Sequence, residues 1–465
     1  MLFGSALPQV LATNAKNLLL LAYGMTIGFP TILIPQVADY RNSTLHGGEE
    51  DLRLSLEEIS WISSINLLTV PLGCLLSGRL TQPFGRKKSM ICLNVPLGIA
   101  WVVYYFSDSA GMLYLALSIT GLAGGLLEAP VLTYVAEITE PQFRGFLSAT
   151  ASMGVILGVF IQFLLGSVYP WRTVALINIA IPILAIIAIA QVPESPHWLL
   201  GQGRVEDAKK SLCWLRGWVD EKDVAMELGH LQEVLTNKEQ PKKSWAPYLK
   251  RSFFHPYFLV CYVFFIGHFG GMTTLQTFAV GMFKEVGSPL DEYKATVILG
   301  LVQLVGALVC VCLVKFTGRR KLAVSTSMVA GIVFILVGAG NFYEFGRGHF
   351  SLYGLLLTAF FTHSAIRLLP WMLIGEVYPA EVRGTASGLS GGTGYLMGFA
   401  ANKSYIYLHS WLGLPGTLTL YGCISCLGAL GTIAFLPETE GKSLAEVGKI
   451  FEGKENPAFK DESKL

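Results

Sequence analysis

Tyr134-Val-Ala-Glu137-Ile-Thr-Glu-Pro-Gln-Phe-Arg144-Gly145 returns later in the chain as Leu373-Ile-Gly-Glu376-Val-Tyr-Pro-Ala-Glu-Val-Arg383-Gly384. Both copies hold a glutamate, six further residues and then Arg-Gly. A second pair, Gly85-Arg86-Lys87-Lys88 and Gly318-Arg319-Arg320-Lys321, recurs at nearly the same interval. Each copy stands at the end of a long apolar run. Repeats of this kind predict two homologous membrane halves in the same orientation, which is an architecture of transporters.

The composition is that of a polytopic membrane protein. Of the 465 residues, 52% are hydrophobic and only 14% are charged, whereas soluble domains carry about 25% charged residues. A bilayer core of about 30 Å requires about 20 apolar residues in each helix. Twelve runs predict membrane spans, at 16–38, 57–78, 89–107, 111–136, 146–167, 171–192, 254–282, 293–314, 322–341, 350–374, 385–408 and 415–436.

Lysine and arginine in the short loops predict the orientation. If the N-terminus is inside, the inner short loops hold ten of these residues and the outer ones hold six. The positive-inside rule therefore predicts that both termini are cytoplasmic. None of the eight cysteines falls in a predicted outer loop, so we expect no disulfide framework.

These patterns divide the chain into four parts. Two six-helix bundles are predicted at 1–192 and 254–436, with a cytoplasmic helical linker at 193–253 and a cytoplasmic tail at 437–465. The linker opens with Glu194-Ser195-Pro196, a polar cap followed by proline at a first helical position. Apolar residues then recur at helical spacing, at Val205, Ala208, Leu212 and Leu215.

Two short motifs give further expectations. Asn42-Ser43-Thr44 in the first predicted outer loop is an N-glycosylation sequon, which makes Asn42 a candidate glycosylation site. The final Ser463-Lys464-Leu465 matches the peroxisomal address, which normally delivers soluble proteins. A plain polar tail is the competing interpretation.

Several stretches resemble the sugar porter family of the major facilitator superfamily. They are Gly78-Arg-Leu-Thr-Gln-Pro-Phe-Gly-Arg-Lys, Pro193-Glu-Ser-Pro, Pro370-Trp371 and Pro437-Glu-Thr-Glu-Gly, together with both Glu-x6-Arg-Gly copies. Asn402-Lys403-Ser404-Tyr405 and the short tail are most similar to insect facilitated trehalose and hexose transporters. The resemblance implies an all-α membrane protein with twelve transmembrane helices in two pseudo-symmetric six-helix bundles.

The resemblance also implies a cytoplasmic gate network. Its salt bridges cross the cytoplasmic ends of the two halves, hold the inner side shut in the outward-open state, and break when the halves rock. An exposed pair contributes about 0–1 kcal/mol, but a partly desolvated network can bias a two-state equilibrium. A solvated positive-inside loop is the competing interpretation. The implied members are Arg86, Glu137, Arg144, Glu194, Arg319, Glu376, Arg383 and Glu438.

The sugar-contacting positions depart from the family pattern. The seventh span has lost the usual glutamines, and the usual Asn-Trp of the eleventh span is Gly394-Tyr395. Trp371 remains and could stack on a sugar face. Hydroxyl-rich ligands need several directed donors and acceptors in a largely apolar pocket, so the missing amides put ordinary hexose recognition in doubt. The substrate-path candidates are Glu128, Ser152, His268, Thr273, Gln276, Thr277, Gln303, Arg367, Trp371 and Gly394.

Glu128 and Arg367 are repeat-equivalent charges inside the fourth and tenth spans. Each precedes the glutamate of its repeat by the same interval, which sets both near the middle of a bilayer core about 30 Å thick. Intramembrane charges are functional hypotheses by default. We expect a Glu128–Arg367 pair that acts as a central gate or polar ligand site; separate partners for the two charges are the alternative.

The function expected is solute transport by alternating access, with facilitated diffusion of glucose or trehalose favoured. The run from Ala22 to Phe29 lacks the carboxylate usual in proton-coupled members, which favours a uniporter. The alternatives are another polar or organic-ion solute, or a non-transporting nutrient sensor. We expect no enzyme activity, cofactor, metal or nucleic-acid partner. The expected partners are the solute and the lipid bilayer, the expected location is the plasma membrane, and a monomer is favoured.

Overall fold

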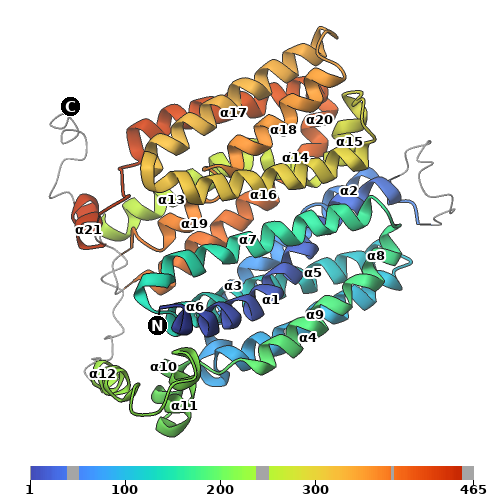
Figure 1. Cartoon of the computed structure of the whole chain (residues 1–465). Helices are drawn as coiled ribbons and strands as arrows, with labels where there is room; N and C mark the ends of the chain where they lie inside the picture. Colours follow the sequence, from blue (N-terminus) through green and yellow to red (C-terminus); the bar gives the residue numbers. More distant parts are fainter. Residues whose placement is uncertain (1, 39–51, 237–250, 379–381, 443, 453–465) are drawn as a thin grey trace. The chain divides into compact units, whose positions relative to one another are not determined.

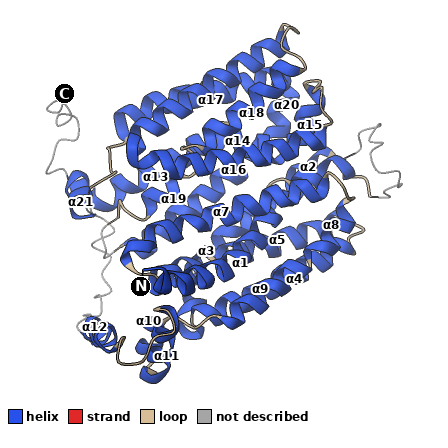
Figure 2. Ribbon diagram, viewed as in Figure 1, coloured by secondary structure: helices blue, strands red, loops and turns tan. Residues whose placement is uncertain are grey.

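The computed structural model of the chain describes residues 2–38, 52–236, 251–378, 382–442 and 444–452. The Asn42 sequon and the Ser463-Lys464-Leu465 end lie outside these residues. Within them the regular structure is helical, apart from an isolated β-bridge between Ala38 and Leu54 (Figure 2).

The chain forms two compact units. Unit 1 comprises Met1–Phe29, Leu72–Leu165 and Tyr169–Lys242, and unit 2 comprises Pro30–Pro71, Gly166–Val168 and Lys243–Leu465. Unit 2 therefore contains the end of the first predicted span and the beginning of the second, in addition to the predicted C-terminal bundle.

Unit 1 contains most of the N-terminal helices. They are α1 (Leu2–Val37) and α3 (Ile65–Phe84), which both continue into unit 2, and α4 (Arg86–Tyr105), α5 (Ala110–Leu126), α6 (Glu128–Ile138), α7 (Pro141–Gly166), α8 (Trp171–Asn178), α9 (Ala180–Gln191), α10 (Pro196–Gly201), α11 (Val205–Leu215) and α12 (Ala225–Thr236). Helix α4 contacts α5, α6, α8 and α9 (Figure 1). Apolar side chains such as Leu97 and Ile189 are fully buried in this core.

Unit 2 contains the remaining helices. They are α2 (Leu56–Ile62), α13 (Arg251–Phe269), α14 (Met272–Thr277), α15 (Ala279–Glu285), α16 (Glu292–Thr317), α17 (Arg319–Phe342), α18 (His349–His363), α19 (Leu369–Ile374), α20 (Arg383–Phe435) and α21 (Leu444–Glu452). Helix α17 packs against α18 and α20, while α16 packs against α18 and α13 against α20 (Figure 1).

The helices account for the twelve predicted spans. In the described residues, ten helical segments are long and apolar enough to cross a membrane. One of them, α20, joins the eleventh and twelfth predicted spans across a kink at Gly413, whose φ is 66°. The tenth predicted span is divided into α18 and α19, and neither helix alone is long enough to cross.

The fourth and tenth spans are interrupted at equivalent positions. Glu128 begins α6 directly after the break that follows α5, and Arg367 lies in the turn between α18 and α19. A proline follows closely in both copies, at Pro130 and Pro370, and proline has no N–H to donate to the preceding turn. The carbonyl of Leu126, freed in this way, accepts a hydrogen bond from the Ser77 hydroxyl at 2.6 Å.

The connecting helices form a small cluster of their own. Ser195 caps α10 and accepts from the Trp198 N–H, with Pro196 following, as the sequence predicts. Buried residues of α10, α11 and α12 and of the turn before α12 form an apolar core: Leu199, Ala208, Leu212, Val224 and Leu228. Arg216 joins this cluster to the end of α6, because its guanidinium pairs with Glu227 at 2.6 Å and donates to the Ile138 carbonyl at 3.1 Å. Outside the membrane spans, a hydrogen bond from Lys209 lowers the pKa of Glu221.

Candidate functional site

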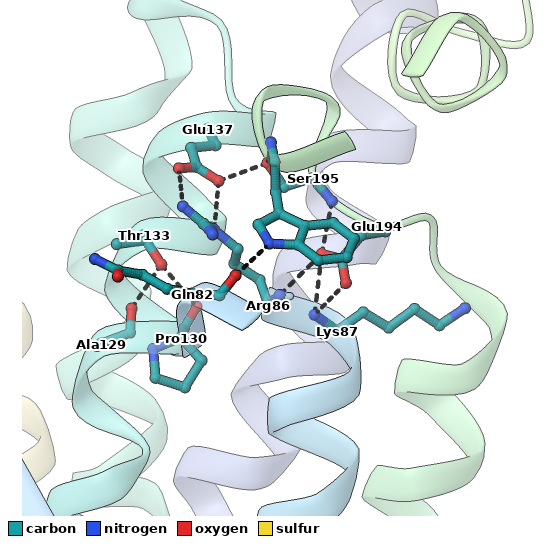
Figure 3. A network of polar contacts seen from close by, with 10 residues as sticks. Gln82, Arg86, Lys87, Ala129, Pro130, Thr133, Glu137, Glu194 and Ser195 are labelled. Carbon is teal, nitrogen blue, oxygen red and sulfur yellow. Dashed lines mark hydrogen bonds and ion pairs between the residues drawn. The ribbon is translucent and has the colours of Figure 1, made fainter. Parts of the chain in front are cut away.

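The first candidate gate site lies at the ends of α4 and α6. The Arg86 guanidinium donates to both carboxylate oxygens of Glu137, at 2.8 and 2.7 Å (Figure 3). The Ser195 hydroxyl donates to the same carboxylate at 2.5 Å. The two charged side chains are only 15% and 18% exposed, so the pair is better shielded from water than a surface ion pair. A bidentate pair of this kind fixes the geometry of both partners.

A second carboxylate, that of Glu194, holds the start of α4. It accepts the backbone N–H groups of Arg86 at 3.1 Å and Lys87 at 3.0 Å, and that of Ser195 at 2.8 Å (Figure 3). The first N–H groups of a helix have no partner within the helix, and its N-terminus attracts negative charge. Gly85 provides no side-chain cap and has a φ of 88°. A Cβ at Gly85 would lie 2.5 Å from the Glu194 carboxylate, so this close approach requires glycine.

Unit 2 repeats the arrangement. Arg319 forms an ion pair with Glu376 and another with Glu440 at 3.0 Å. The Glu438 carboxylate accepts the backbone N–H groups of Arg319 at 3.0 Å and Arg320 at 3.1 Å. Gly318 again has a positive φ, of 78°, and a Cβ there would collide with the Glu438 carboxylate. We call the set Gly85, Arg86, Glu137 and Glu194 the N-clamp, and the set Gly318, Arg319, Glu376 and Glu438 the C-clamp.

The clamps bring together six of the eight predicted gate residues. Each clamp joins three stretches that are distant in sequence, and every ion pair described in it lies inside one unit. Of the other two, Arg144 donates to the Thr139 carbonyl at 3.2 Å. Arg383 begins α20, and its side chain is outside the described part of the chain. The sequence predicted only a capping role for Ser195 and no role for Glu440, although Ser195 directly follows the gate residue Glu194 and Glu440 lies two residues after the gate residue Glu438.

Three substrate-path candidates meet in unit 2. The Arg367 guanidinium donates through one nitrogen to the Thr273 hydroxyl at 3.0 Å and approaches Nδ1 of His268 at 3.3 Å. Nδ1 of His268 also lies 2.9 Å from the Thr273 hydroxyl. Because guanidinium only donates, Nδ1 is the acceptor and the imidazole is neutral with its proton on Nε2. The residues come from the end of α13, the start of α14 and the break before α19. We call these three residues the Arg367 cluster.

Aromatic rings lie next to the Arg367 cluster. The Trp371 ring centroid is 5.2 Å from that of Phe264 and 5.5 Å from that of Tyr395. Phe264 stacks on the His268 ring at 6.1 Å. A Cβ at Gly394 would lie 2.7 Å from the Phe264 ring. The position that carries asparagine in the family pattern is therefore glycine because Phe264 fills the adjoining space.

The remaining substrate-path candidates are dispersed. The Gln276 carbonyl accepts from Thr31 at 2.9 Å, and the Thr277 hydroxyl accepts from Asn402 at 3.1 Å. Gln303 is 1% exposed, and its amide nitrogen has no hydrogen-bond partner among the described residues. Ser152 and Glu128 belong to unit 1 and Arg367 to unit 2, so the predicted Glu128–Arg367 pair stays a prediction.

A further polar cluster in unit 2 links α2 to α20. The Lys403 ammonium lies 2.9 Å from the Glu57 carboxylate and 4.0 Å from the centre of the Trp61 ring. The Tyr407 hydroxyl donates to Glu57 at 2.5 Å. The Asn402 amide donates to the Ser63 carbonyl at 2.8 Å. We call Glu57, Trp61, Lys403 and Tyr407 the Lys403 cluster.

Comparison with known proteins defines the class. Residues 18–451 match the family described as Sugar (and other) transporter. The chain belongs to this family and is a multi-pass membrane transporter, and the predicted fold class is confirmed by its structural neighbours. The inward-open xylose transporter XylE from E. coli aligns with a TM-score of 0.76 at 20% identity, over 94% of this chain and 98% of that one. XylE bound to 6-bromo-6-deoxy-D-glucose aligns with a TM-score of 0.71, over 95% and 99%.

Relatives by sequence include transporters with trehalose in their names. The facilitated trehalose transporter Tret1 of Polypedilum vanderplanki is 27% identical over 455 residues, covering 96% of this chain and 88% of its own length. Tret1 of Apis mellifera ligustica is 25% identical with the same two coverages. The sequence-based resemblance to sugar porters and to these insect transporters is confirmed.

Proposed function

We propose that this transporter moves a sugar by facilitated diffusion, with trehalose or glucose as substrate. The observation that carries the proposal is the doubled clamp, since two equivalent rigid ends are what a carrier built from two rocking repeats needs. The trehalose transporters that the chain resembles support the choice of sugar. The absence of a carboxylate between Ala22 and Phe29 favours a uniporter.

In this mechanism the parts that move are the predicted bundles, 1–192 and 254–436, joined by the linker 193–253 and followed by the tail 437–465. The clamps keep the helix ends within each bundle fixed while the bundles rock. Arg144 and Arg383 complete the gate on the cytoplasmic side. The Lys403 cluster belongs to the opposite, outer side, and its contacts between α2 and α20 must break when that side opens.

The proposed setting is the plasma membrane, with both termini cytoplasmic and the chain acting as a monomer. The basic inner loops support this orientation. On this topology Asn42 faces outward and is a candidate for glycosylation, which a shift in gel mobility after glycosidase treatment would test.

The test is uptake of labelled trehalose and glucose by cells that express the chain, with and without an imposed proton gradient. We expect saturable uptake that does not respond to the gradient. A Glu438→Gln variant, which weakens the C-clamp, is expected to reduce the maximal rate at equal surface abundance. Absence of uptake of either sugar by verified surface protein would refute the sugar proposal.

The second candidate function is transport of another polar or organic-ion solute. The Arg367 cluster favours it, because a guanidinium in the middle of a span is costly and marks solute or ion pathways. Uptake of a charged solute without uptake of either sugar would support this candidate. Ligand-dependent signalling with no solute flux would instead support a nutrient sensor.

A further inference from the structure

Arg367 carries a positive charge that its own unit does not neutralise. It contacts a threonine hydroxyl and a neutral imidazole, and among the described residues of unit 2 no carboxylate lies within ion-pair distance of it. A buried cation without a counter-charge is costly. Its neighbours Ile366 and Leu368 are 3% and 7% exposed, whereas Arg367 itself is only half-buried. Arg367 therefore keeps some exposed surface, unlike the residues on either side of it.

The hydrogen-bonding arrangement leaves one edge of the guanidinium available. Both described contacts of Arg367 use the same terminal nitrogen, which has two hydrogens to donate. The Nε–H and the second terminal nitrogen make up the edge that matches a carboxylate through two parallel hydrogen bonds. The contacts of His268 and Thr273 with the first terminal nitrogen of Arg367 fix the plane of the guanidinium.

The surroundings fit an organic anion better than a neutral polyol. Trp371 is half-buried, and its ring lies against Phe264, which stacks on His268 of the cluster, so a ring or an apolar body can stack on Trp371 while an acid group reaches Arg367. Phe264 fills the space beside Gly394, where a side-chain amide would otherwise be available for a hydroxyl group. The site therefore offers one charged hydrogen-bond donor, the Arg367 guanidinium, among aromatic rings.

We infer that the Arg367 cluster binds the carboxylate of an organic acid, and that the substrates of this transporter include a sugar acid of the hexuronate type. The inference rests on the proposed function in that it takes the cluster to lie on the solute path. The ring of the sugar stacks on Trp371, and the carboxylate accepts from the free edge of Arg367. This assigns a specificity role to Arg367 in addition to the sugar transport proposed above.

The test compares D-glucuronate with D-glucose, which carry a carboxylate and a hydroxymethyl group at the same ring position. Binding of each labelled compound is measured on the purified full-length protein in nanodiscs. We expect tighter binding of glucuronate, and a weakening by about 30-fold or more in Arg367→Gln, since truncating one partner of a buried charge pair has that scale of effect. Glucose binding should change much less, and Arg367→Lys should recover part of the loss.

Matched variants separate the possible explanations. Arg347→Gln removes the charge of a 60%-exposed arginine that pairs with Glu344 in a loop, and it should leave glucuronate binding unchanged. Glu128→Gln should leave it unchanged or strengthen it. Equal weakening of glucose and glucuronate in Arg367→Gln, or a glucuronate affinity of the wild type no higher than its glucose affinity, would overturn the inference. The wild-type comparison decides the matter even if Arg367→Gln does not fold.

Failure of the inference is distinguishable from failure of the proposed function. Glucose or trehalose flux in proteoliposomes without any preference for glucuronate would refute the proposed acid site and still support sugar transport. Glucuronate binding that depends on Arg367, with no flux of either neutral sugar, would instead support the acid site and refute the proposed transport of neutral sugars.

Discussion

Removing the Lys403 ammonium should favour opening on the side of the Lys403 cluster. Lys403 is 19% exposed and lies over the Trp61 ring, a contact that stabilises by about 1 kcal/mol when partly desolvated. The Glu57 carboxylate is 59% exposed, so its ion pair is well screened and contributes little. Lys403→Met should therefore shift the ratio of open to closed conformers about fivefold, and Glu57→Gln should shift it much less.

A cysteine at the buried position 31 serves as the reporter of opening. Thr31 is 1% exposed and donates to the Gln276 carbonyl, so Thr31→Cys in a background without native cysteines should react slowly with an impermeant maleimide added outside. The reaction rate should rise about fivefold in Lys403→Met, because it follows the open population. Lys294→Met removes an exposed charge from the beginning of α16 and serves as the control.

The reasoning would be refuted by two results. Equal alkylation rates in Lys403→Met and Lys294→Met would show that the Lys403 cluster does not hold α2 and α20 together. A larger effect of Glu57→Gln than of Lys403→Met would show that the ion pair, and not the contact with Trp61, dominates.

Three further changes test the packing. Gly318→Ala should lower the thermal midpoint in detergent by the equivalent of about 1–3 kcal/mol, because the left-handed backbone and the Glu438 carboxylate leave no room for a methyl group. Lys16→Met should raise the midpoint, because the ammonium is fully buried without a hydrogen-bond partner in the described residues. Gly394→Asn should reduce the yield of folded protein as judged by gel filtration, and adding Phe264→Ala should restore part of it.

For each of these three substitutions, one result would contradict the expected outcome. Gly388→Ala introduces a methyl group into open space on α20, and an equal loss there would remove the steric argument for the C-clamp. Loss of transport in a stable Lys16→Met variant would give that lysine a functional role. Full folding of Gly394→Asn alone would show that Phe264 can move aside.

The repeat made the architecture predictable from the sequence. The intervals that separate Glu137 from Glu376 and Arg144 from Arg383 are equal, and twelve apolar runs fixed the number of spans. Most residues of the two clamps were predictable, because the same charged residues recur with the same neighbours in both copies of the repeat. The use of backbone N–H groups by Glu194 and Glu438 was less predictable, because it depends on two positive-φ glycines and on distant segments meeting.

The interruptions of the fourth and tenth spans carried a signal that sequence reasoning did not use. Pro130 and Pro370 follow Glu128 and Arg367 in both copies, and proline removes a hydrogen bond from the preceding turn. The partners of Arg367 could not be read in advance, because His268 and Thr273 belong to another broken span. The exclusion of a side chain at Gly394 likewise depends on the position of Phe264, which only packing reveals.

Counterflow in proteoliposomes tests the central claim most directly. Vesicles that contain the purified protein are loaded with unlabelled trehalose and diluted into a trace of labelled trehalose, with a matched set for glucose. An alternating-access sugar carrier should accumulate label transiently above the outside concentration, because exchange continues while the unlabelled sugar leaves. Label that never rises above equilibrium for either sugar, in vesicles with verified protein, would contradict the assignment of this chain as a sugar transporter.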